Sequence, residues 1–140
     1  MAAMIAFMNE SMNEIAFYTL AGAPESPRDL IQEVQTAEEM GIGSCFISER
    51  FNIKEAATLS GAAGAISSRI GLATAATNQN TRHPLVTAAY ASTMHFLTDG
   101  RFSLGLGRGI DPMMKALGLN PITHGADGGF CRHHASHAQG

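Results

Sequence analysis

Residues 69–107 read RIGLATAATNQNTRHPLVTAAYASTMHFLTDGRFSLGLG, and this stretch decides the fold. Its first seven residues form a short apolar run typical of a buried strand, and residues 101–107 alternate large apolar with small side chains, which predicts another strand. Between them, Pro84 is suited to open a helix and Gly100 to end it. The strands of such a unit run parallel and are joined by a right-handed crossover. On this helix we expect five residues to face inward: Val86, Ala89, Tyr90, Thr93 and Leu97.

The same alternation extends toward the amino terminus. Two further strands are predicted over residues 15–20 and 44–48, because β-branched, aromatic and apolar residues gather there. Helices are predicted after each of them, since apolar side chains recur every three or four residues. The faces that we expect to be buried are Leu30, Val34 and Ala37, before a stop at Gly41, and Ala56, Leu59, Ala63 and Ile66, within a helix over residues 54–66.

The fold class is therefore α/β, with parallel strands and about four strand–helix units. Two architectures fit this order: an open doubly wound sheet of the flavodoxin type, or a partial (β/α)₈ TIM barrel. A complete barrel typically needs about 250 residues. The 140 residues of this chain would form about half of one.

The composition excludes several classes of protein. Hydrophobic residues make up 45% and charged residues 15% of the chain, which argues against disorder throughout. The net charge of -3 gives no basic surface for nucleic acid, and no apolar run approaches the length of a membrane span. Two cysteines form no disulfide framework, so we expect a reducing, cytoplasmic setting.

Residues that could carry chemistry follow the predicted strands, because parallel α/β proteins place their sites at the carboxyl ends of the strands. Four segments qualify: Glu49 with Arg50, the small and hydroxyl side chains of residues 74–78, Arg82 with His83, and the glycine-rich residues 105–109. Each also has a structural interpretation: a surface ion pair, a polar loop, a helix cap or a packed strand end. The glycine pattern is not a dinucleotide-binding fingerprint, because Ile110 occupies its last glycine position and the pattern follows the fourth strand rather than the first.

These segments, taken together and in order, resemble the luciferase-like monooxygenase superfamily over about residues 12–122. The residues that carry the resemblance are AEEMG at 37–41, FISER at 46–50, RIGL at 69–72, RHP at 82–84 and GRFSLGLGRG at 100–109. The nearest branch is that of the coenzyme F420-dependent oxidoreductases. The resemblance implies a (β/α)₈ barrel that holds a deazaflavin or flavin at the carboxyl ends of its strands, and either hydride transfer or monooxygenation of a small-molecule substrate.

The resemblance also assigns roles to individual residues. Glu49 matches the acid after the second strand that lies near the cofactor, and Arg50 stands where many members have histidine. Because arginine stays protonated, Arg50 would stabilise negative charge on a reduced ring rather than carry a proton. The cofactor-binding positions are Thr74 and Ala75, at a bulge that is often a non-prolyl cis peptide, then Thr77, Gly107, Arg108 and Gly109. Coenzyme F420 is the expected cofactor, with FMN as the alternative.

The composition changes near residue 123. Residues 1–122 are expected to form the half-barrel, and residues 123–140 an unstructured tail that holds four of the six histidines. One hypothesis is that this tail is translated out of frame from about His124, because the shifted frame permits an amphipathic helix; genomic DNA tests it. The weaker alternative is a metal site, since His133 and His137 are four residues apart. We expect no metal at the cofactor site.

Half a barrel leaves two open sheet edges, for which a homodimer is one solution. The missing half also keeps a second function open: a non-catalytic fragment or interaction module. An open flavodoxin-like ligand-binding domain is the weaker alternative.

Overall fold

The computed structural model describes residues 12–51 and 53–119. The predicted tail and its histidines, including His124, lie outside the described residues, so the hypotheses about them and the boundary at residue 122 stay predictions. The elements are, in order, β1 (Ala16–Tyr18), α2 (Asp29–Glu39), β2 (Ser44–Ile47), α3 (Ala56–Ile66), β3 (Gly71–Thr74), β4 (Thr77–Asn78), the 3₁₀ turn η1 (Gln79–Thr81), α4 (Pro84–Leu97), β5 (Phe102–Ser103), β6 (Leu106–Gly107) and α5 (Asp111–Ala116).

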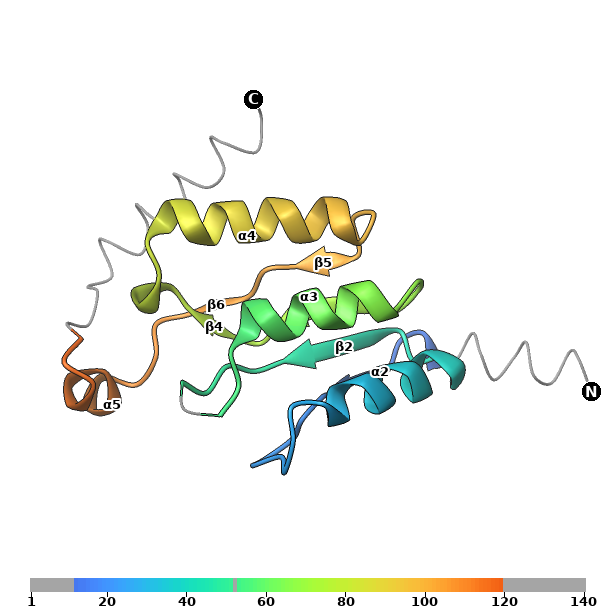
Figure 1. The fold of residues 1–140 in the computed structure, drawn as a ribbon, viewed down its shortest axis with the longest axis horizontal. Coiled ribbons are helices and arrows are strands. Elements are labelled where there is room, and N and C mark those ends of the chain that lie inside the picture. The colour runs from blue at the N-terminus through green and yellow to red at the C-terminus, as the bar shows by residue number, and fades with distance from the viewer. Residues whose placement is uncertain (1–11, 52, 120–140) are drawn as a thin grey trace, which may run out of the picture.

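The main sheet has the strand order β1-β2-β3-β5, and every neighbouring pair is parallel. The second pair, β4-β6, is parallel as well. Helices α2, α3 and α4 run side by side (Figure 1). The predicted parallel α/β order of strands and helices is confirmed.

The core lies between the helices and one face of the main sheet. In β2 and β3 every second side chain is buried, as the two-residue period of a strand requires. The predicted inward faces of α2 and α3 are confirmed: all their named residues are buried, except that Ile66 is half-buried against the core. Gly41 follows α2 with a φ of 76°, a conformation that glycine adopts at low cost.

Two predicted strands are interrupted or shortened in the structure. The run at 101–107 divides into β5 and β6, whereas the run at 69–75 ends as β3 at Thr74, and β4 follows outside it at Thr77–Asn78. The cause is a close approach between the two runs: the Thr74 hydroxyl donates to the Gly105 carbonyl oxygen at 2.9 Å and accepts from the Gly105 N–H at 2.8 Å. A Cβ at Gly105 would collide with the Thr74 carbonyl oxygen. The Thr74 hydroxyl thus takes the place of backbone hydrogen bonds between the β3–β5 pair and the β4–β6 pair.

The predicted inward face of α4 is wrong except at Tyr90. Val86 is 56% exposed and Leu97 is 51% exposed, whereas Thr87 and Met94 are buried and Tyr90 packs partly against the core. The helix carries apolar residues all around its circumference, so hydrophobic periodicity could not select the buried side.

Candidate functional site

A pocket of about 800 Å³ lies at the carboxyl ends of the strands. The loop after β2, the segment through β4, the end of β6 and helix α5 surround it. Its volume lies within the range of small-molecule sites. The lining residues are Glu49, Arg50, Phe51, Ile53, Ala76, Thr77, Asn78, Gly107, Gly109, Ile110, Met113 and Leu117.

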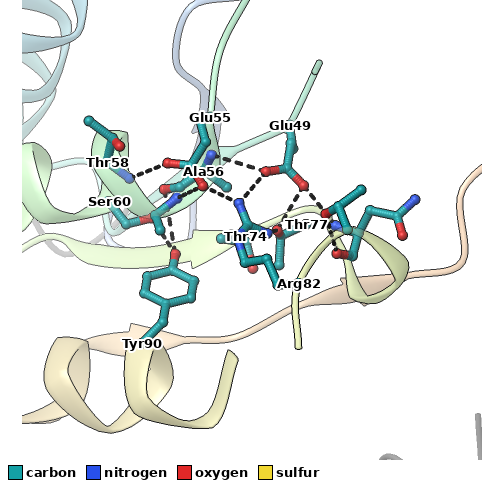
Figure 2. Close-up of polar contacts among 12 residues, drawn as sticks. Glu49, Glu55, Ala56, Thr58, Ser60, Thr74, Thr77, Arg82 and Tyr90 are labelled. Carbon is teal, nitrogen blue, oxygen red and sulfur yellow. Dashed lines mark hydrogen bonds and ion pairs between the residues drawn. The ribbon is translucent and has the colours of Figure 1, made fainter. Parts of the chain in front are cut away.

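Glu49 is the polar centre of this region (Figure 2). Its side chain is only 4% exposed. One carboxylate oxygen accepts from the Thr77 hydroxyl and from the Asn78 N–H, both at 2.9 Å. The other oxygen faces the Arg82 guanidinium at 2.5 Å and the Ala56 N–H at 3.4 Å. One carboxylate therefore joins the end of β2 to β4 and to the first residue of α3.

Arg82 holds this carboxylate from behind the pocket. Besides Glu49, its guanidinium donates to the Thr77 hydroxyl at 2.7 Å and forms an ion pair with Glu55. Glu55 is also the N-cap of α3, accepting from the backbone N–H groups of Ala57 at 3.1 Å and Thr58 at 2.7 Å. The acid–arginine–acid chain thus connects the pocket to a helix terminus, where a carboxylate is stabilising.

The electrostatics keep both acids ionised. Burial opposes the ionisation of Glu49, but hydrogen bonds from Arg82, Asn78 and Thr77 outweigh it and hold the pKa of Glu49 below its ordinary value. Burial also opposes the ionisation of Glu55, and the hydrogen bonds from Thr58, Ala57 and Arg82 lower its pKa to about 2. A group so stabilised as an anion is suited to holding its neighbours rather than to taking up a proton at neutral pH.

The floor of the pocket is made of small residues and backbone. The peptide bond between Ala75 and Ala76 is cis, one residue beyond the Thr74–Ala75 pair at which the resemblance places it. At Gly107 an added Cβ would lie 3.3 Å from the Ala76 Cβ. Gly109 has a φ of 80°, and a Cβ there would press on Met114, which also accepts from the Asn78 amide at 3.4 Å. Glycine at 109 therefore lets α5 dock on β4.

The loop after β2 is held by a backbone bridge and by a buried lysine. The backbones of Arg50 and Lys54 form a short antiparallel bridge, with N–H to oxygen distances of 3.0 and 2.9 Å. Lys54 is 5% exposed and donates from Nζ to the Leu20 carbonyl oxygen at 2.6 Å. This anchor leaves the Arg50 side chain exposed at the pocket.

The structure brings together five of the predicted site residues. They are Glu49, Arg50, Thr77, Gly107 and Gly109, all of which line the pocket. The other three lie outside the lining: Thr74 is 2% exposed beneath it, Ala75 precedes Ala76 in the cis peptide, and the Arg108 carbonyl accepts from the Asn80 amide at 2.8 Å. The chemical roles assigned to these eight residues remain predictions.

Sequence reasoning missed the apolar wall and the partners of Arg82. The wall residues Ile110, Met113 and Leu117 come from α5 and its two cap positions, and the only sequence signal for this helix was Pro112 after an acidic residue. The sequence placed Arg82 beside His83 at the start of a predicted helix but gave no sign of its pairing with Glu49 and Glu55. His83 instead caps α4, its Nδ1 accepting from the Leu85 N–H at 3.3 Å, which confirms the capping interpretation.

The described residues contain neither a metal-binding cluster nor a membrane-spanning helix. No cluster of three or more His, Cys, Asp or Glu side chains is placed to hold a metal ion. None of the described helices combines the length and apolar character that crossing a bilayer requires.

Comparison with known proteins gives consistent matches. A family model described as luciferase-like monooxygenase matches residues 10–128. A 5,10-methylenetetrahydromethanopterin reductase from Methanopyrus kandleri is 29% identical over 108 residues, which cover 77% of this chain and 31% of that protein.

Two solved structures share the fold. The coenzyme F420-dependent tetrahydromethanopterin reductase from Methanopyrus kandleri has a TM-score of 0.64 at 27% identity, covering 76% of this chain and 29% of that one. The oxygenating constituent of 3,6-diketocamphane monooxygenase from Pseudomonas putida, in complex with FMN, has a TM-score of 0.64 at 25% identity, covering 74% of this chain and 31% of that one. This chain thus spans less than a third of the length of these relatives.

Proposed function

Since the chain belongs to the luciferase-like monooxygenase family, we propose that its pocket binds coenzyme F420, with FMN as the alternative, for the oxidoreduction of a small molecule. Oxidoreductase or monooxygenase activity is the general activity of this family. The observation that carries the proposal is the convergence of three strand ends on one pocket, with a backbone floor, a fixed anion behind it and an apolar wall.

The residues present fit a flat redox ring. Ala76, Gly107 and Gly109 line the pocket without large side chains, so a planar group could lie close to the backbone. Ile110 and Met113, which also line the pocket, offer apolar contact. When bound, either cofactor would supply two-electron chemistry, as a hydride donor or acceptor.

The chain's own polar residues have separate tasks in this proposal. Glu49 is a positioning residue: its charge holds the Thr77 hydroxyl and the Asn78 N–H at the rear of the ring site. Arg50, exposed at the pocket, stabilises negative charge on the reduced ring. Neither residue transfers a proton, because Glu49 is held as an anion and arginine keeps its proton.

The choice of F420 over FMN rests on resemblance. The similar reductase is named as F420-dependent, and the similar monooxygenase is described with FMN. The activity stays a proposal for this chain, which covers less than a third of these relatives. The expected cytoplasmic setting likewise stays a prediction.

Titration of the purified full chain with F420 and with FMN, followed by cofactor fluorescence, tests the proposal. We expect saturable binding, tighter for F420. Gly107→Ala, which places a methyl group 3.3 Å from the Ala76 Cβ, is expected to weaken it about tenfold, equivalent to about 1.4 kcal/mol. Gly61→Ala is the matched control, because a Cβ there meets nothing within 4 Å.

Absence of binding by either cofactor in a folded chain would contradict the proposal. Binding without turnover would support the second function considered from the sequence, a non-catalytic fragment.

A further inference from the structure

Among the described residues that line the pocket, Arg50 is the charged side chain available to a ligand. The lining holds two charged residues, Glu49 and Arg50. Glu49 is 4% exposed, and its carboxylate already accepts from Arg82, from the Thr77 hydroxyl and from backbone N–H groups. Arg50 is exposed, and no described carboxylate lies within ion-pair distance of its guanidinium. A ligand that enters the pocket therefore meets an uncompensated positive charge.

A second cation lies near Arg50 without competing for the ligand. Burial lowers the pKa of the Lys54 ammonium, the charge of Arg50 lowers it further, and Glu33 acts in the opposite direction. Lys54 is 5% exposed, and its Nζ donates to the Leu20 carbonyl oxygen at 2.6 Å. The Lys54 charge thus adds to the positive potential around Arg50, while its donors point into the fold.

The apolar wall of the pocket comes from an exposed stripe on α5. Met114 is fully buried and accepts from the Asn78 amide, so it anchors the helix on β4. Ile110, Met113 and Leu117 recur at spacings of three and four residues and so share one side of the helix. They are 65%, 50% and 51% exposed and line the pocket. This stripe is available to an apolar ligand, because Met114 already holds the helix in place.

The loop after β2 adds two more large apolar side chains. Phe51 and Ile53 line the same pocket and are 41% and 39% exposed. Helix α5 lies apart from α2, α3 and α4, on the side toward which β2 points (Figure 1). Exposed apolar side chains that cluster around a cavity mark a binding site. The volume of about 800 Å³ lies toward the upper end of the range for small-molecule sites, so a second molecule has room beside a ring.

Resting on the proposed function, we infer that the substrate is an apolar monocarboxylate, bound beside the cofactor ring. Its carboxylate pairs with Arg50, and its hydrocarbon part lies on the stripe of Ile110, Met113 and Leu117. A guanidinium has five N–H donors, so one edge can hold a carboxylate through two hydrogen bonds while other donors face the reduced ring. A phosphate group normally takes several cations or backbone N–H donors, whereas here the donors of Lys54 are turned away.

Calorimetric titration of the full chain with octanoate, octanol and octylammonium tests the inference. The three probes share one hydrocarbon chain and differ in charge. We expect octanoate to bind at least about tenfold more tightly than octanol, because its hydrogen bonds to Arg50 are charge-assisted, and octylammonium to bind most weakly. Arg50→Met should abolish the preference for octanoate and leave the affinity for octanol unchanged. Arg28→Met, at an exposed position outside the lining, is the matched control and should keep the preference.

The apolar half of the inference has its own variant. Met113→Ala should weaken octanoate and octanol by the same factor, about fivefold, because both lose the same apolar contact. Met40→Ala, at an equally exposed methionine after α2, is the control and should change neither affinity. An octanoate affinity that Met113→Ala leaves unchanged would contradict the placement of the hydrocarbon part on α5.

The same titrations with saturating F420 or FMN separate this inference from the proposed function. We expect the loaded chain to bind octanoate at least as tightly as the free chain. Equal affinities for octanoate and octanol, or a preference that survives Arg50→Met, would overturn the inference while cofactor binding stands. Displacement of the cofactor by octanoate would also overturn it, because the two would then share one place. A chain that binds octanoate but neither cofactor would contradict the proposed function and, with it, the role of the acid as substrate.

Discussion

Replacement of Arg82 by methionine tests the electrostatic design of the pocket most directly. Methionine keeps most of the aliphatic stem and removes the guanidinium. That group lies 2.5 Å from a carboxylate oxygen of Glu49, whose side chain is 4% exposed, and 2.7 Å from the Thr77 hydroxyl. The variant therefore leaves an anion in a site almost without solvent, with only neutral donors around it.

The expected loss of unfolding free energy depends on the contacts that Glu49 keeps in the variant. Removing one partner of a buried ion pair costs about 3–5 kcal/mol, because the other charge stays buried. Glu49 retains the Thr77 hydroxyl and the Asn78 N–H, each at 2.9 Å, and Arg82 itself is 14% exposed. Both facts reduce the cost, so we expect the unfolding free energy to fall by about 2–3 kcal/mol.

Urea unfolding at neutral pH, followed by circular dichroism, measures this value for four chains: wild type, Arg82→Met, Glu49→Gln and the double variant. If the charge pair is the cause, Arg82→Met costs much less when Glu49 is already neutral. Arg28→Met, at an exposed position, should change the stability by less than about 0.5 kcal/mol. An equal cost of Arg82→Met in both backgrounds would refute the reasoning.

Three further predictions concern pH, a thiol and a loop. The pKa of Glu55 is about 2 and that of Glu49 is also lowered, so their contribution to stability is complete above the unfolded-state value of about 4.3 and is lost as the pH falls toward about 2. Urea midpoints should therefore decrease over that interval, and an unchanged midpoint would contradict the assignment. Burial raises the pKa of the Cys45 thiol to about 12, so in a Cys131→Ser chain Ellman's reagent should react only on unfolding; rapid reaction of the native chain would show that Cys45 is accessible. Glu38 accepts from the backbone N–H groups of Ser68, Arg69 and Ile70 before β3, so Glu38→Gln should lower the thermal midpoint, at a cost of about 1–2 kcal/mol. Glu39→Gln, exposed on the same helix, is its control and should leave the midpoint unchanged.

The sequence predicted the features that depend on local pattern. Leu30, Val34 and Ala37 repeat at helical spacing, and most of the residues between them are polar, so one face of α2 was favoured for burial. The four strands of the main sheet have enough apolar and β-branched residues to be recognised one by one. Their parallel order followed from the alternation of strands with helices, and the position of the pocket followed from that order.

What the sequence could not predict depends on contacts between distant residues. Glu49 and Arg82 are 33 positions apart, and their pairing requires the bend after β3 to bring a loop back beneath β2. That bend depends on the contact between Thr74 and Gly105, which no local propensity encodes. The buried side of α4 was also undetermined, because apolar residues surround the helix.

The contact of Thr74 with Gly105 separates two tiers of strands. The lower tier is the main sheet of β1, β2, β3 and β5, and the upper tier is the pair β4 and β6. The lower tier contributes its strands to the apolar cluster, whose described members come from residues 17–72 and 90–104. The upper tier, with β4 and β6, adds no side chain to that cluster and instead borders the pocket. Substitutions in the loops of the upper tier can therefore change ligand preference without altering the apolar cluster. For protein engineers, this makes the lower tier a ready platform onto which foreign binding loops can be grafted.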